Sequence, residues 1–254
     1  MLLPTDPRLH LPFDILAWAA SAVLARWLYV WRLRPVADLV ADQLSPAYSL
    51  SLAGGAIAGG WLLGSANTML TGVPHLSHSI AGALAGAIIA VETYKAVAGI
   101  RGSTGIIWVG PFALGIAIGR FGCLFAGIAD ETFGSPTTMP WGIDLGDGVS
   151  RHPVQLYESF SMLAFLLLYL RALSRRAPWA TTGAFYVLVG WYGVQRFVWE
   201  FFKPYPRLVG PLDIFQLCAL GLIAYAVVYH ERTRRSQLAQ DQPVAVLRAD
   251  DQPV

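Results

Sequence analysis

The feature that most constrains this sequence is a series of apolar segments long enough to cross a membrane. They cover approximately 13–31, 47–70, 79–99, 104–119, 156–173, 180–199 and 210–229. A membrane-spanning helix needs about 20 predominantly apolar residues. Only 13% of the 254 residues are charged and the mean hydropathy is +0.51, whereas a soluble globular chain has about 25% charged residues. The sequence therefore predicts an all-α polytopic membrane protein with seven transmembrane helices and no separate soluble domain.

Basic residues between these segments predict the orientation of the chain. Four connections on one side carry them: Arg32 and Arg34; Lys95 and Arg101; Arg171, Arg175 and Arg176; Arg232, Arg234 and Arg235. The positive-inside rule assigns that side to the cytoplasm. We therefore expect an outer N-terminus, a cytoplasmic C-terminus, and an extracytoplasmic loop segment, 120–155, between the fourth and fifth helices.

The two ends of the sequence are expected to differ in structure. The stretch 1–18 lacks the basic start and small-residue cleavage site of a signal peptide, so its apolar continuation is expected to remain as a helix. The segment 231–254 is polar and has no apolar periodicity, which favours disorder. We therefore expect a membrane domain over 1–230 and a disordered cytoplasmic tail over 231–254.

Charge and cysteine content exclude several functions. A net charge of +2 is far from the basic patches of nucleic-acid-binding proteins, so no nucleic acid is expected as a partner. Cys123 and Cys218 lie far apart and form no metal-binding spacing such as CxxC. The prediction is therefore two buried free thiols, with no metal site and no cofactor.

Small residues recur four apart in "GGAIAGGWLLG" (54–64), "GALAG" (82–86) and "GIAIG" (115–119). Such spacing lets membrane helices approach closely. The simplest interpretation of this spacing is tight packing between helices, with no further function. No repeat of 20 to 50 residues is visible, which disfavours solenoids and inverted-repeat transporters.

Polar residues concentrate at the predicted outer ends of the helices. Arg120 follows "GPFALGIAIG", the stretch 150–159 reads "SRHPVQLYES", and Arg196 with Glu200 ends the sixth apolar segment. A charge at a helix centre costs roughly 2.5–3.5 kcal/mol on insertion scales, so this placement is informative. Because the charges gather at one face instead of the bilayer midplane, a transporter is disfavoured.

The stretch "RHPVQLYE" reads as a helix N-terminus, since Pro153 suits a first helical turn. Gln155 and Glu158 are three residues apart and would share a helix face. Free N–H groups and the positive dipole end favour a phosphate there. Arg120, Arg151 and Arg196 could supply two-donor forks to that anion.

Arg196 and Glu200 are four residues apart, so the simplest interpretation is an ion pair on one helix face. His75 and His78 border the short outer loop "TGVPHLSHS". The simplest interpretation is that they are surface-loop histidines without a catalytic role.

Four stretches in this order resemble the prolipoprotein diacylglyceryl transferase family: "GRFGCLFAG" (119–127), "FGSPTTMPWGID" (133–144), "RHPVQLYES" (151–159) and "RFVWEFFKPYP" (196–206). The similarity extends from about 47 to 220. It implies a seven-helix bacterial inner-membrane enzyme. Such an enzyme transfers the diacylglyceryl group of phosphatidylglycerol to the thiol of a lipobox cysteine in a preprolipoprotein, and the bilayer supplies the lipid.

The resemblance implies roles for individual residues. Arg120 would bind the lipid phosphate, and Arg196 with Glu200 would be the paired groups near the end of the sixth helix. The remaining substrate-binding positions would be Arg151, Gln155, Tyr157, Glu158 and Glu131. His152 is expected to act as the base that takes the proton of the thiol, with His78 as its rival, because an unperturbed imidazole titrates near 6.5.

The chain departs from the family pattern at several places. Cys123 and Ala126 stand where the signature GR.GNF.NGE has asparagines, and Glu131 matches its glutamate only approximately because "IAD" intervenes. The His-Gly-Gly of the third helix is replaced by "AGA" (81–83), with His78 one turn earlier, and the "WYG" of the first helix is absent. Two alternatives stay open: a paralogue that uses the same lipid with another acceptor, and a non-catalytic lipid-binding membrane protein.

Overall fold

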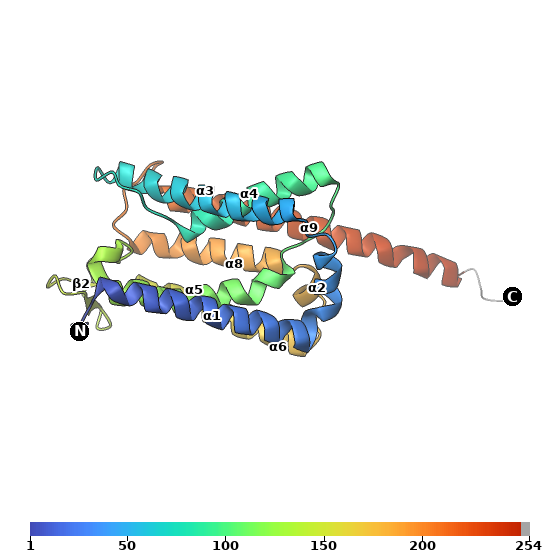
Figure 1. Ribbon diagram of the computed structural model, residues 1–254, viewed down its shortest axis with the longest axis horizontal. Coiled ribbons are helices and arrows are strands. Elements are labelled where there is room, and N and C mark those ends of the chain that lie inside the picture. The colour runs from blue at the N-terminus through green and yellow to red at the C-terminus, as the bar shows by residue number, and fades with distance from the viewer. Residues whose placement is uncertain (250–254) are drawn as a thin grey trace.

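The protein is an all-α polytopic membrane protein, as a computed structural model of the chain shows (Figure 1). The structure describes the backbone of residues 1–249 and the side chains of residues 1–236. The α-helices are α1 (His10–Leu28), α2 (Arg34–Ala41), α3 (Pro46–Leu70), α4 (Ile80–Ala98), α5 (Val109–Ala126), α6 (Val154–Ser174), α7 (Trp179–Thr182), α8 (Ala184–Trp199) and α9 (Ile214–Ala249). Short helical turns join them: η1 (Pro7–Leu9), η2 (Tyr29–Leu33), η3 (Ile106–Trp108), η4 (Gly127–Asp130) and η5 (Glu200–Phe202).

Within the described residues, six helical segments have the length and hydropathy to cross a membrane: Pro7–Ala41, Pro46–Leu70, Ile80–Ala98, Ile106–Asp130, Val154–Ser174 and Ile214–Ser236. Helix α8 falls at the remaining predicted segment, but its 16 residues extend only about 24 Å at 1.5 Å per residue. The polytopic class is therefore confirmed, whereas the seventh span remains a prediction. Helix α9 continues to Ala249, into the stretch for which the sequence favours disorder; residues 250–254 lie outside the described residues.

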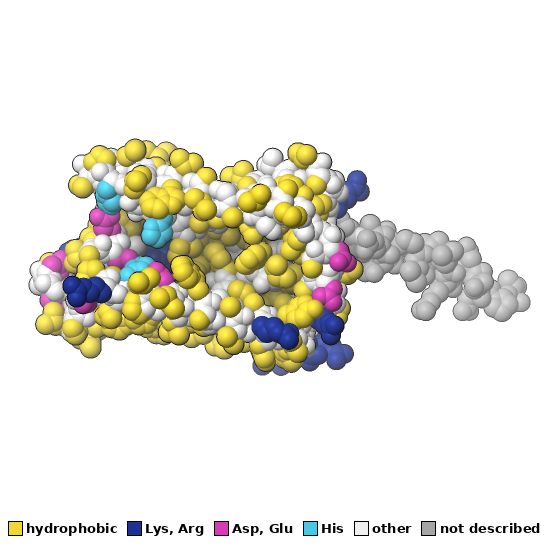
Figure 2. Space-filling view, in the orientation of Figure 1, with side chains coloured by type: hydrophobic (Ala, Val, Ile, Leu, Met, Phe, Trp, Pro, Cys, Tyr) yellow, Lys and Arg dark blue, Asp and Glu magenta, His cyan; other side chains and the backbone are white. Residues whose placement is uncertain are grey.

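The helices pack mainly in four pairs, α3 against α4, α1 against α5, α5 against α6 and α8 against α9. In Figure 1, α8 lies between a layer with α3, α4 and α9 and a layer with α1, α5 and α6. The core between them contains fully buried Phe165, Tyr169, Leu188 and Tyr192. The outer surface is apolar along its length (Figure 2), and Trp18 and Leu62 are each 72% exposed. This distribution suits helices surrounded by lipid.

Glycines bring α3 and α4 into backbone contact, which confirms the close packing that the spacing predicts for 54–64 and 82–86. In the third stretch, 115–119, Gly119 has no neighbour within 4 Å of an added Cβ atom. A Cβ atom at Gly59 would collide with the carbonyl oxygen of Gly82, and one at Gly86 with that of Gly55. Without side chains at these positions, two helices approach more closely than larger residues permit.

One end of the bundle carries the N-terminus, the ends of α5 and α8, and the start of α6 (Figure 1). Strands β1 (Ile143–Asp144) and β2 (Ser150–Arg151) form an antiparallel hairpin there, with Ile143 opposite Arg151. The connection 127–153 thus lies over the end of the bundle where the predicted functional residues lie.

Candidate active site

Five charged side chains from four parts of the chain meet in one buried network. Glu158 Oε1 accepts hydrogen bonds from Arg196 Nη1 at 3.0 Å and Lys203 Nζ at 2.7 Å, and its Oε2 lies 2.5 Å from Arg120 Nε. Glu200 Oε1 lies 2.7 Å from Arg196 Nε and accepts from Lys203 Nζ at 3.2 Å. Each of the five residues is at most 5% exposed. The predicted pairing of Arg196 with Glu200 is confirmed, and both arginines share Glu158.

The local fold explains why these residues meet. Arg120 lies near the end of α5, Glu158 near the start of α6, and Arg196 in the last turn of α8, directly before Glu200 in η5. Helix α6 packs between the other two helices. The network contains three cations and two carboxylates, so it has a surplus of one positive charge. Because a buried charge without a partner is costly, this surplus favours an anion nearby.

A cavity of about 550 Å³ lies beside the network, and Arg120 and Arg196 both contribute to its wall. His78 and Glu131 also line it. Figure 2 shows histidine and acidic side chains around a hollow at the end of the molecule where the N-terminus lies. The rest of the wall combines apolar side chains with polar ones, including the carboxylates of Asp14 and Asp130. Arg120 and Arg196 can hold a phosphate there, and lipid chains can lie along the apolar part.

Three predicted residues form a separate group beside the hairpin and do not line this cavity. His152 Nδ1 lies 3.3 Å from the hydroxyl of Tyr157, which accepts a hydrogen bond from Trp141 Nε1 at 2.8 Å. Arg151 donates to Asp147 Oδ2 at 2.6 Å. No side chain caps α6, which begins after Pro153, so the ring of His152 does not act as the helix cap.

The remaining predicted residues differ in their surroundings. Gln155 shares the buried face of α6 with Glu158, as their spacing predicts, and its amide atoms have no hydrogen-bond partner among the described residues. Glu131 is exposed and adopts a left-handed backbone conformation at φ 58°. Its Oε2 lies 3.0 Å from His75 Nε2, and its carbonyl oxygen accepts from the Tyr205 hydroxyl at 3.0 Å.

Two ionisable groups on the connection between η5 and α9 have shifted pKa values. Removal from water raises the pKa of Tyr205, and the negative charge of Glu200 adds to the rise. The hydroxyl therefore stays protonated and can donate to Glu131. Removal from water also raises the pKa of Asp213, although Arg207 Nη1 lies 3.1 Å from its carboxylate. Asp213 Oδ1 accepts from the backbone N–H of Gln216 at 2.8 Å and so caps α9.

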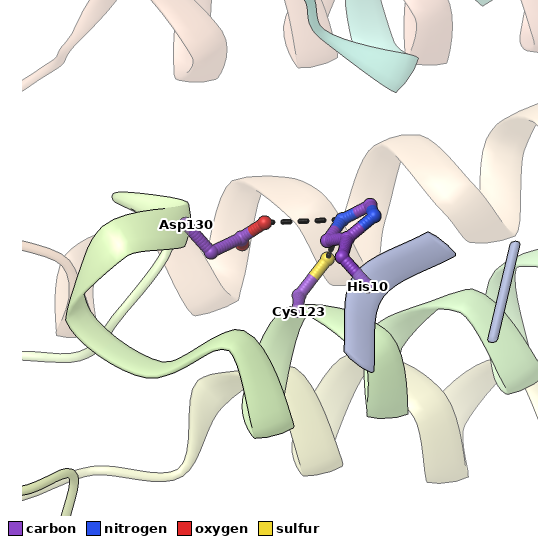
Figure 3. Close-up of side chains that lie close together, drawn as sticks. All are labelled: His10, Cys123 and Asp130. Carbon is purple, nitrogen blue, oxygen red and sulfur yellow. Dashed lines mark hydrogen bonds and ion pairs between the residues drawn. The ribbon is translucent and has the colours of Figure 1, made fainter. Parts of the chain in front are cut away.

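The structure brings a further group to the cavity that sequence reasoning did not assign. Cys123, one turn after Arg120 on α5, lies beside His10 at the start of α1 and Asp130 at the end of η4 (Figure 3). Lys203 also joins the ion network. Two features of the sequence could have drawn attention to these residues. Cys123 replaces an asparagine of the resembled pattern, and Lys203 is a charged residue close to Glu200. Nothing in the spacing pairs His10 with Cys123, 113 residues away.

Comparison with known proteins supports the resemblance. A family model described as "Prolipoprotein diacylglyceryl transferase" matches residues 12–230. Curated relatives named "Phosphatidylglycerol--prolipoprotein diacylglyceryl transferase" include one from Finegoldia magna, 33% identical over 137 residues, or 54% of this chain and 53% of the relative. The Methylococcus capsulatus relative is 37% identical over 158 residues, or 58% of each chain. That from Wolbachia pipientis of Culex pipiens is 40% identical over 129 residues, or 46% and 47%.

The matches to curated relatives cover only part of each protein. The chain spans about half the length of the curated relatives it matches. No solved structure matches it.

Proposed function

The chain belongs to the prolipoprotein diacylglyceryl transferase family, and from that premise we propose that it transfers the diacylglyceryl group of phosphatidylglycerol to the lipobox cysteine of a preprolipoprotein. The thiol sulfur attacks the glycerol carbon that carries the phosphate. The carbon–oxygen bond to the phosphate breaks, a thioether forms, and glycerol phosphate leaves with the electron pair.

The surplus positive charge of the buried network is the observation that carries this proposal. Arg120 and Arg196 line the cavity and are held by Glu158, which contacts both. Preorganised donors of this kind stabilise charge that develops on a leaving group in a water-poor site. Arg120 and Arg196 bind the phosphodiester in this proposal, while Glu158 and Glu200 position their guanidinium groups.

The remaining predicted residues keep the substrate-binding role that the resemblance implies. Glu131, Arg151, Gln155 and Tyr157 contribute to substrate binding in this proposal. His152 is the proposed base, and His78 is its rival.

His152 matches the family run, whereas His78 lines the cavity. A base must come within hydrogen-bond reach of the proton it takes, directly or through one water. Activity of His78→Asn and His152→Asn decides between them.

We further propose the seven-span topology of the inner membrane, with the N-terminus outside and the C-terminus in the cytoplasm. Helix α8 and η5 together cover Ala184–Phe202, which is long enough to serve as the seventh span. Residues 1–230 form the membrane domain, and 231–254 form a separate cytoplasmic tail. The basic connections cited above support this orientation. A single cysteine at Gly146, in a chain without its own cysteines, is then labelled from outside, and one at Ser174 is protected.

The decisive experiment reconstitutes the purified protein in vesicles with phosphatidylglycerol and a lipobox peptide. We expect the peptide to gain the mass of one diacylglyceryl group, and a peptide with Ser in place of its Cys to stay unmodified. Release of glycerol phosphate without peptide modification would identify another acceptor. Binding of phosphatidylglycerol with neither product would identify a non-catalytic lipid-binding protein.

A further inference from the structure

His10, Cys123 and Asp130 point toward one another from three elements at the wall of the cavity (Figure 3). His10 Nε2 lies 3.6 Å from Cys123 Sγ and 3.1 Å from Asp130 Oδ1. The nitrogen, sulfur and carboxylate ligand atoms all lie within 4.8 Å of one another. An imidazole, a thiol and a carboxylate are the three types of side chain that bind zinc in proteins.

Two of the three separations are close to the edges of a zinc coordination tetrahedron. With bond lengths of about 2.3 Å to sulfur and about 2.1 Å to nitrogen and oxygen, a zinc ion separates nitrogen from sulfur by about 3.6 Å and nitrogen from oxygen by about 3.4 Å. The observed separations of 3.6 and 3.1 Å lie close to these values. The third separation, between Cys123 and Asp130, is at most 4.8 Å, and binding of one ion would bring these two ligand atoms to about 3.6 Å from each other.

Two of the three side chains also have a hydrogen-bonding partner outside the cluster that fixes their orientation. His10 Nδ1 lies 2.9 Å from Asp14 Oδ2, which leaves Nε2 free to face the cluster. The Thr132 hydroxyl donates to Asp130 Oδ2, and so leaves Oδ1 facing His10. A histidine that binds a metal almost always donates its other N–H, often to a carboxylate. The carboxylate beside Nδ1 is an independent observation that points to a metal at Nε2.

The charges around the cluster are compatible with a divalent cation. Thiolate and carboxylate ligands from Cys123 and Asp130 would neutralise a Zn²⁺ ion, and the carboxylate of Asp14 lies behind His10. Arg120 Nη1 lies 3.7 Å from Cys123 Sγ, but its guanidinium is paired with Glu158. Its N–H would then donate to a metal-bound thiolate, in the way that outer hydrogen bonds support zinc ligands.

We propose that His10, Cys123 and Asp130 bind one Zn²⁺ ion and that its fourth coordination position receives the acceptor thiol. The role of the acceptor rests on the proposed transferase function, whereas the zinc site does not. Three protein ligands with a fourth position for substrate are the arrangement of catalytic zinc sites. The three ligands line the same cavity as Arg120 and Arg196, so a thiol bound there faces the phosphate site.

The site supplies the thiolate that the transfer requires, because a thiol that coordinates zinc is deprotonated. The proton of the acceptor passes to whichever of His152 and His78 serves as the base, and from there to solvent. The sulfur then attacks the glycerol carbon while the bond from that carbon to the phosphate oxygen breaks. The thioether is a weaker zinc ligand than the thiolate and leaves with the product. Zinc neither gains nor loses electrons.

Metal content tests the site without any transfer assay. Wild-type protein purified without chelator and loaded with Zn²⁺ should retain about one ion per chain after dialysis. Cys123→Ser and Asp130→Asn should weaken retention by about tenfold or more, and Asp14→Ala by about tenfold. Cys218→Ser is the matched control, since the second cysteine lies outside the cluster, and it should retain zinc. Equal zinc in all variants, or none in the folded wild type, would overturn the proposal. The latter result would leave His10 as an imidazolium between Asp14 and Asp130.

Cobalt tests the fourth position. Protein loaded with Co²⁺ should show thiolate-to-cobalt charge-transfer absorption that is absent from Cys123→Ser. A lipobox peptide should increase that absorption, and its Cys→Ser counterpart should not. Metal binding without this increase would overturn the role of the acceptor. A diacylglyceryl adduct on Cys123 itself would show that this thiol is a nucleophile and would also overturn it. A spectral response without transfer would instead indicate failure of the proposed function.

Discussion

Two groups of charged side chains lie at opposite ends of the bundle, and their charges balance differently. Near the end of α4, Lys95 Nζ lies 2.9 Å from Glu92 Oε1, which also accepts from the Tyr225 hydroxyl at 2.9 Å. The Lys95–Glu92 pair has no net charge, and the Tyr225 hydroxyl gives Glu92 a second hydrogen-bond donor. The five-residue network beside the cavity retains one positive charge. The first pair therefore has no net charge, whereas the second network has one positive charge available for an anion.

The largest effect is expected from Arg120→Lys. Lysine keeps the charge but loses the planar fork of donors that contacts Glu158 and a phosphate. Loss of a hydrogen bond to a charged group costs about 1.5–3 kcal/mol, so transfer should fall by about tenfold or more. Initial rates in vesicles at matched protein levels measure it. An unchanged rate would remove Arg120 from the phosphate site and weaken the contrast between the two groups.

Lys203→Met removes the surplus charge itself. It leaves two arginines facing Glu158 and Glu200, a balanced set, so the thermal stability should change little. Loss of one positive charge near the phosphate should weaken binding by roughly 1–2 kcal/mol at an effective dielectric constant of about 20, or about five- to thirtyfold in KM. Glu200→Gln changes the charge in the opposite direction, since it removes a carboxylate and raises the surplus positive charge of the network.

The KM for phosphatidylglycerol and kcat, measured separately, distinguish these variants. A lowered kcat at constant KM in Lys203→Met would contradict a role in attracting the lipid.

The neutral pair should respond in the reverse way. Lys95→Met leaves Glu92 without its cation and should destabilise the protein by about 1–3 kcal/mol, with transfer per folded molecule unchanged. The double variant Glu92→Gln/Lys95→Met should recover part of that loss. Thermal unfolding in detergent and initial rates measure the two effects. Lost transfer in the folded Lys95→Met protein would show that this end of the bundle also serves the reaction.

The sequence could predict the membrane class and one of the two charge groups in part. Arg120, Glu158, Arg196 and Glu200 stand out because charges in apolar helices are costly and therefore few. Their meeting at Glu158 depends on how α5, α6 and α8 pack, which spacing along the chain does not reveal. The site of Cys123 depends in the same way on the packing of α1 against α5. A search for metal-binding spacings along the chain finds no site there, because its residues come from three separate elements.

The smallest effect is expected at a third pair, which extends the comparison to the exposed surface. Arg151 Nη2 donates to Asp147 Oδ2 at 2.6 Å in the hairpin, and this hydrogen bond lowers the pKa of the Asp147 carboxyl. A carboxyl whose pKa is lower in the folded state stabilises that state above its ordinary pKa of about 3.9, and the contribution disappears as the pH falls through the lowered value. Because Asp147 is exposed, water and salt screen the pair. Asp147→Asn should therefore lower Tm only slightly at pH 7, and the difference from wild type should vanish below the lowered pKa and in high salt. Unfolding scans at several pH values and salt concentrations measure this. A large loss of Tm at pH 7 that persists in high salt would show that the hairpin ion pair resembles the buried groups, and that burial does not set the order of these effects.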